Sequence, residues 1–175
     1  MDGTLLNSRR RVSDRTSSVV RKILEKYPNI HFVLASGRAK PATKLIREKL
    51  GIVNRPKTES LLCNGCLAYD SNGAIIWQNI IPQDFILHVH QKLCKGVFPE
   101  CVIFYSTGDY TILFQKEWAK FATEKCDEIA VVEDMQKYIK KIESGNVKIN
   151  KISFMVFEPS DVEGLFLFYN IINSI

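Results

Sequence analysis

A largely apolar run at residues 30–35 is the feature that most restricts how this chain can fold. The run is rich in strand-forming residues and ends at a turn-forming segment, residues 36–38. Nearly continuous hydrophobicity, rather than alternation, is typical of a strand that is buried on both faces of a parallel sheet. Helical patterns flank the run at residues 15–27 and 41–50. This alternation of helix and strand predicts an α/β fold built from βαβ units.

The second half of the chain follows a different pattern. A strong turn signal at residues 71–73 lies inside a predicted hairpin at residues 67–77. Beyond it, two strands and a helix recur, which predicts an α+β sandwich with helices on one face of its sheet. We therefore expect one domain at residues 1–80 and a second at residues 81–175.

Composition excludes several classes of protein. The 175 residues are 46% hydrophobic and 25% charged, as in ordinary globular proteins, which excludes collagen-like and largely disordered chains. The formal net charge of +5 is too small to indicate a nucleic-acid partner. No apolar run approaches the ~18 residues that a membrane span needs, and a signal peptide is not evident at the N-terminus. With five scattered cysteines, these features predict a cytoplasmic protein with reduced thiols and no membrane partner.

Three short motifs carry the functional information. Residues 1–8 read Met-Asp-Gly-Thr-Leu-Leu-Asn-Ser, residues 32–38 form an apolar strand that ends in Ser-Gly-Arg, and residues 63–66 read Cys-Asn-Gly-Cys before a hairpin. Each motif alone would be an ordinary turn or chain end. Their order and spacing together resemble the haloacid dehalogenase (HAD) superfamily, in particular its Cof-like phosphatase branch with a large α/β cap. The resemblance covers roughly the first 80 residues.

The resemblance implies a partial Rossmann-like parallel-sheet core with an inserted α+β cap. It implies hydrolysis of small phosphate esters, such as sugar phosphates, through an aspartyl-phosphate and with Mg²⁺. Asp2 matches the catalytic acid and base of the family, and its backbone carbonyl is expected to bind Mg²⁺. The partner is then a small phosphorylated metabolite, while a protein partner stays unknown. The residues expected to bind phosphate or substrate are Met1, Gly3, Thr4, Ser36, Gly37, Arg38, Asn64 and Gly65.

Elementary chemistry supports two of these assignments. The Ser36 hydroxyl and the Gly37 N–H lie where a strand ends before a helix, and such positions favour phosphate oxygens. For Arg38 two alternatives stay open, because its guanidinium could pair with a carboxylate or contact the substrate.

The chain departs from the family pattern in three places. No Asp stands at the nucleophile position of the first motif, and neither the family's Lys nor its acidic metal loop follows the cap. Gly108-Asp109 begins like that loop but lacks the second acid. We expect the chain as written to be inactive, since loss of a covalent nucleophile costs orders of magnitude in rate. Two hypotheses follow: a phosphatase sequence truncated at both ends, or a pseudophosphatase that binds a ligand or partner.

A zinc site is the third and weakest hypothesis. Cys63 and Cys66 together with His88 and His90 could supply four ligands. However, histidines two residues apart on a predicted helix point in different directions. A basic stretch at residues 137–148 fits a solvated helix face better than a nucleic-acid site.

Overall fold

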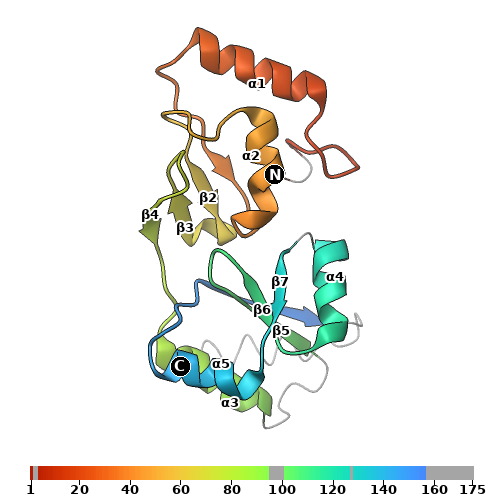
Figure 1. The fold of residues 1–175 in the computed structure, drawn as a ribbon, viewed down its shortest axis with the longest axis vertical. Coiled ribbons are helices and arrows are strands. Elements are labelled where there is room, and N and C mark those ends of the chain that lie inside the picture. The colour runs from red at the N-terminus through yellow and green to blue at the C-terminus, as the bar shows by residue number, and fades with distance from the viewer. Residues whose placement is uncertain (2–3, 95–100, 127, 157–175) are drawn as a thin grey trace.

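The structure is a computed structural model that describes residues 1, 4–94, 101–126 and 128–156. It contains two four-stranded sheets, which we assign to a core that extends through β4 (Ile75–Gln78) and a cap that begins at α3 (Gln83–Cys94) (Figure 1). The core sheet has the order β1-β2-β3-β4, with strands Leu34–Ala35, Ser60–Leu62, Leu67–Tyr69 and Ile75–Gln78. The cap sheet has the order β7-β6-β5-β8, with strands Ala130–Val132, Thr111–Leu113, Cys101–Ser106 and Lys151–Val156.

The core sheet confirms the predicted α/β class. β1 and β2 run parallel, with Leu34 opposite Ser60, whereas β3 and β4 are antiparallel, so the sheet is mixed. β1 is shorter than the apolar run that predicts it. The Phe32 N–H still donates to the Lys57 carbonyl at 2.9 Å. Lys57 has a φ of 63°, however, and this left-handed conformation interrupts the strand geometry opposite Phe32.

The helices of the core begin and end at clear local signals. α1 spans Asp14–Lys26, and its N-cap Ser13 accepts a hydrogen bond from the Thr16 N–H at 3.0 Å. A short 3-10 turn, η1 (Pro41–Thr43), leads into α2 (Lys44–Leu50), which Gly51 ends with a φ of 71°. Among the described residues, no helix is both long and apolar enough to cross a membrane.

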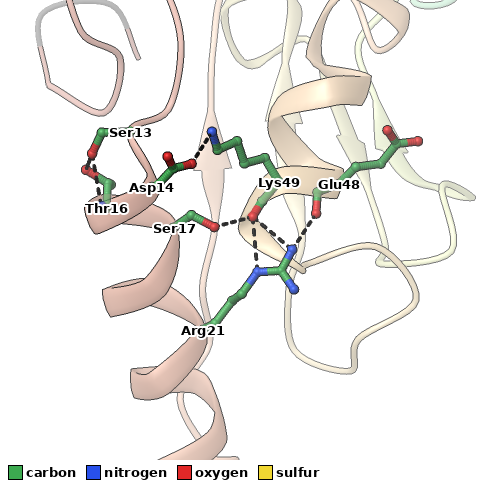
Figure 2. A network of polar contacts seen from close by, with 7 residues as sticks. All are labelled: Ser13, Asp14, Thr16, Ser17, Arg21, Glu48 and Lys49. Carbon is green, nitrogen blue, oxygen red and sulfur yellow. Dashed lines mark hydrogen bonds and ion pairs between the residues drawn. The ribbon is translucent and has the colours of Figure 1, made fainter.

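A polar network joins α1 to the C-terminal end of α2 (Figure 2). The Arg21 guanidinium donates to the Lys49 carbonyl at 2.9 and 3.1 Å and to the Glu48 carbonyl at 2.9 Å, and the Ser17 hydroxyl also donates to the Lys49 carbonyl. The Lys49 ammonium lies 2.7 Å from Asp14 and holds the pKa of that carboxyl below its ordinary value. Because the last carbonyls of a helix lack partners within the helix, α1 supplies the donors that α2 needs.

The helices of the cap cover both faces of its sheet, so the expectation of one covered face is wrong. α3 (Gln83–Cys94) and α5 (Met135–Glu143) enclose a cluster with Tyr105 and Ile112, while α4 (Lys116–Cys126) packs on Phe104 and Leu113. Figure 1 shows α4 apart from the α3–α5 pair. Successive strand residues point to opposite faces. Apolar residues at neighbouring positions therefore require a helix on each face.

The segment that leads from the core into the cap is hydrogen bonded to the segment that joins α5 to β8. The Ile81 N–H donates to the Ile149 carbonyl at 2.9 Å, and the Asn150 side-chain amide donates to the Asn79 carbonyl at 2.7 Å. The Asn150 N–H in turn donates to the Ser106 carbonyl at 2.9 Å. The start of the cap is thus fixed against the segment that precedes β8.

Two leucines of α2 provide a matched test of the core. Leu50 is 0% exposed and Leu45 is 78% exposed. Leu50→Ala should lower the free energy of unfolding by ~2–5 kcal/mol, because it leaves a cavity in the core. Leu45→Ala on the same helix should change it by less than ~0.5 kcal/mol. Urea unfolding of both variants checks this, and equal effects would contradict the packing described.

Candidate functional site

Two loops at the carboxyl ends of β1 and β2 form the centre of the candidate site. The Ser36 N–H donates to the Leu61 carbonyl at 2.9 Å and the Asn64 N–H to the Ser36 carbonyl at 3.3 Å. The Cys63 N–H donates to the Arg38 carbonyl at 3.1 Å. Because parallel strands end at the same sheet edge, these bonds bring five predicted site residues together, namely Ser36, Gly37, Arg38, Asn64 and Gly65.

The second loop has an unusual backbone. Cys63, Asn64 and Gly65 have φ values of 52°, 57° and 89° in succession. Glycine adopts this region freely and asparagine tolerates it, but a cysteine there costs on the order of 1–2 kcal/mol. Cys63 is 0% exposed, and its hydrogen bond to Arg38 holds it in place. Such strain persists only where the surroundings determine the conformation, and it is frequent at functional sites.

Gly37 fits against the second loop because it has no side chain. A Cβ at position 37 would collide with the Asn64 side-chain oxygen. Beside it, the Ser36 hydroxyl oxygen accepts from the Arg38 N–H at 3.2 Å. That bond uses an acceptor position of the hydroxyl, so its proton can be donated to a ligand oxygen.

A lysine from the cap reaches the first loop. Lys151, at the start of β8, donates to the Gly37 carbonyl at 3.0 Å and lies 3.7 Å from Glu128. Glu128 in turn accepts from the Thr111 hydroxyl at 3.2 Å. The side chains of Lys151 and Glu128 are only 17% and 13% exposed, so solvent screens this pair less than a surface pair. Lys151 was not predicted from the sequence, because a lysine in an apolar strand carries no local signal of a distant partner.

A second cap contact involves the turn between β5 and β6. The Lys40 N–H donates to the Gly108 carbonyl at 3.0 Å, and its ammonium lies 3.6 Å from Asp109 and 4.8 Å from the centre of the Tyr69 ring. A Cβ at Gly108, which has a φ of 87°, would lie 2.5 Å from a methyl carbon of Leu67. The Gly108-Asp109 pair, which begins like the family's acidic loop, therefore docks the cap on the core.

The first motif is described only in part. Asp2 and Gly3 lie outside the described residues. The Met1 carbonyl accepts from the Leu5 N–H at 3.0 Å and from the Thr4 hydroxyl at 3.1 Å. Met1 packs against the core cluster that contains Leu34. The Thr4 hydroxyl thus donates within its own turn.

The described residues do not form a metal site by themselves. They contain no group of three or more His, Cys, Asp or Glu side chains that could hold an ion. The two loops offer Ser36, Arg38, Cys63 and Asn64, a set without the carboxylates that Mg²⁺ prefers. The four candidate zinc ligands lie in two different parts of the fold. Cys63 begins the 3-10 turn η2 (Cys63–Gly65) of the core and Cys66 is its C-cap, whereas His88 and His90 lie on α3 of the cap.

A cleft of about 1090 Å³ opens between core and cap beside Arg38. Its core wall comes from residues 8–12 and from the helical turns after Arg38, and its cap wall comes from Thr123, Glu124, Glu128 and Ile129. Glu128 also lines the cleft, so both alternatives for the Arg38 guanidinium stay open.

Burial controls the chemistry of the strained cysteine. Burial raises the pKa of the Cys63 thiol to about 11, the Lys151 ammonium acts in the opposite direction, and the Glu128 carboxylate adds to the rise. The thiol is therefore protonated near neutral pH, which makes it a poor nucleophile and a poor metal ligand.

Comparison with known proteins places this geometry in a family. A profile of haloacid dehalogenase-like hydrolases matches residues 1–171. The chain belongs to the haloacid dehalogenase-like hydrolase family. The membership predicted from the three motifs is confirmed.

Relatives of this HAD chain are hydrolases. An uncharacterized hydrolase of Schizosaccharomyces pombe is 29% identical over 160 residues, which cover 87% of this chain and 50% of that protein. A second one from the same yeast is 31% identical over 117 residues, which cover 67% of this chain and 37% of that protein. The chain thus spans half or less of the length of these curated relatives.

Solved structures confirm the HAD fold. A Thermotoga maritima protein superposes with a TM-score of 0.69 at 17% identity, covering 94% of this chain and 57% of that one. A phosphatase of the superfamily from Bacteroides thetaiotaomicron superposes with a TM-score of 0.63 at 18% identity, covering 95% and 57%. At such identities the likeness shows the fold alone.

The contact between Gly37 and Asn64 can be tested by a pair of substitutions in this HAD core. Gly37→Ala should lower the free energy of unfolding by ~1–3 kcal/mol, since the added methyl overlaps the amide oxygen. Asn64→Gly in the same chain removes that oxygen at a position whose φ suits glycine, and it should restore most of the loss. Urea unfolding measures both, with Asn64→Gly alone as control. A double variant no more stable than Gly37→Ala would contradict the contact.

The Cys63 thiol gives a second prediction. At pH 8 a thiol of pKa about 11 is ionised only to ~0.1%. Iodoacetamide should therefore leave Cys63 unmodified while the partly exposed Cys66 reacts, and unfolding in urea should remove the protection. Peptide mapping by mass spectrometry resolves the two sites. Equal modification rates in the folded protein would refute the protected state of Cys63.

Proposed function

We propose that the protein hydrolyses small phosphate esters, such as sugar phosphates, with the phosphoryl group bound by the loops after β1 and β2. The observation that carries this proposal is the set of backbone hydrogen bonds between the two loops. These bonds hold Ser36 and Gly37 beside a cleft between core and cap. Membership in the HAD-like hydrolase family and the likeness to a HAD phosphatase support it.

The residues of the two loops have distinct roles in this proposal. Ser36 donates its hydroxyl proton to a phosphoryl oxygen, since its oxygen already accepts from the Arg38 N–H. Asn64 packs on Gly37 and holds the first loop against the second. Lys151 binds the Gly37 carbonyl and thereby keeps the loop in place under the cap.

The remaining roles in the proposal rest on the resemblance. Asp2 acts as the acid that protonates the leaving oxygen and then as the base toward the water that hydrolyses an aspartyl-phosphate. The Asp that forms this intermediate in the family is not part of the chain as written, so hydrolysis requires an Asp directly before Met1. Mg²⁺ is the proposed cofactor, with the Asp2 carbonyl among its ligands, and when bound it would neutralise charge on the phosphoryl group.

Hydrolysis of p-nitrophenyl phosphate with and without Mg²⁺, by a chain that carries an Asp added directly before Met1, tests the proposal, while the chain as written should be inactive. Asp2→Asn should abolish turnover, and EDTA should do the same. Ser36→Ala should raise KM about tenfold or more, because a hydrogen bond to a charged group contributes ~1.5–3 kcal/mol. Ser18→Ala, an exposed serine on α1, is the matched control and should leave KM unchanged.

Two outcomes would count against this function. Turnover that survives Asp2→Asn would remove Asp2 from the reaction. Phosphate binding that depends on Ser36 without any turnover would replace hydrolysis with ligand binding as the role of the site.

A further inference from the structure

The core wall of the cleft is rich in arginine. Three consecutive arginines, Arg9, Arg10 and Arg11, line the cleft together with Arg38. Lys49 also lines it, but its ammonium lies 2.7 Å from the Asp14 carboxylate, which neutralises it. The positive charge that faces the cleft therefore comes mainly from guanidinium groups.

The acidic residues of the cleft have partners outside its lining. Glu124 lies 3.8 Å from Lys120, and Glu128 lies 3.7 Å from Lys151. Neither lysine lines the cleft. Glu48 is the third acid of the lining, against four arginines. The charge balance of the cleft thus favours an anion.

The three arginines lie on a loop whose conformation is held by hydrogen bonds from and to Asn7. The Asn7 side-chain oxygen accepts from the Arg9 N–H at 3.0 Å and from the Arg11 N–H at 3.1 Å. The Asn7 N–H donates to the Arg11 carbonyl at 3.0 Å, which closes the turn. Arg10 has a φ of 57°, a left-handed conformation that costs on the order of 1–2 kcal/mol for a residue with a side chain. Val12 is only 3% exposed and anchors the loop to the core.

Two of these arginines are available to a ligand. Within the described part of the chain, the guanidinium groups of Arg9 and Arg11 make no ion pair, and both residues are exposed. A guanidinium matches the geometry of phosphate or carboxylate through two parallel hydrogen bonds. The cleft volume of about 1090 Å³ suits a ligand of metabolite size rather than a single phosphate ion.

We propose that Arg9 and Arg11 form a subsite for a second anionic group, so that the substrate is a phosphate ester bearing a further phosphate or carboxylate. The inference rests on the proposed function for the position of the first phosphoryl group, at Ser36 and Gly37. Arg38 connects the two positions, since it follows Gly37 in the chain and its side chain lines the cleft.

Calorimetric titration in EDTA, where turnover is suppressed, tests the subsite. Three probes separate the possibilities: fructose 6-phosphate has no second anion, fructose 1,6-bisphosphate adds a phosphate, and 6-phosphogluconate adds a carboxylate. At least one of the two doubly anionic probes should bind about tenfold more tightly than fructose 6-phosphate. Arg9→Ala with Arg11→Ala should remove that advantage and leave the affinity for fructose 6-phosphate within about twofold.

A matched control excludes a general effect of charge. Arg15→Ala with Lys22→Ala removes the same charge from exposed positions of α1 outside the cleft and should preserve the advantage. Thermal unfolding verifies that both double variants fold.

Three results would overturn the subsite: equal affinity for all probes, an advantage that survives loss of Arg9 and Arg11, or the same loss in the control. Failure of the proposed function would instead appear as absent turnover of p-nitrophenyl phosphate by the chain with the added Asp, together with binding that is insensitive to Ser36→Ala. The two failures are therefore measured by different variants and different readouts.

Discussion

Two backbone hydrogen bonds between the loops after β1 and β2 are the constraint on which the rest of the site depends. They fix Ser36, Arg38, Cys63 and Asn64 relative to one another without using any side chain. The left-handed backbone at residues 63–65 follows from this constraint, because the second loop must turn toward the first while its cysteine stays buried. The absence of a side chain at position 37 follows as well, since the Asn64 amide occupies that space.

Two lysines hold the cap against these loops, one from the core and one from the cap. Lys40 of the core binds the β5–β6 turn of the cap, while Lys151 of the cap binds the loop after β1. Each lysine also has a carboxylate partner on the cap, Asp109 or Glu128. A displacement of the cap would therefore separate the Lys40 ammonium from Asp109 and also remove a hydrogen bond from the Gly37 carbonyl. The position of the cap and the shape of the loop after β1 are coupled through the Lys151 ammonium.

Local signals in the sequence predicted the parallel pair, the helix that Gly51 ends and the hairpin before the cap, because each depends on residues close together in the chain. The helix on each cap face was not predicted, although Phe104 and Leu113 are apolar beside Tyr105 and Ile112. Lys151 could not be predicted, since its partner Gly37 lies 114 residues away. Likewise, the modest net charge gave no hint that the fold gathers arginines in one cleft.

The paired segments at the start of the cap bring together two distant parts of the chain. Residues 79–81 lead into the cap, and residues 149–150, which precede β8, are within hydrogen-bond distance of them. Residues 82–148 therefore form a long excursion whose two ends already meet. Lengthening a surface loop within such an excursion costs little additional loop-closure entropy. The loops between α3 and α5 can therefore change in length and sequence with little effect on the strands of the core.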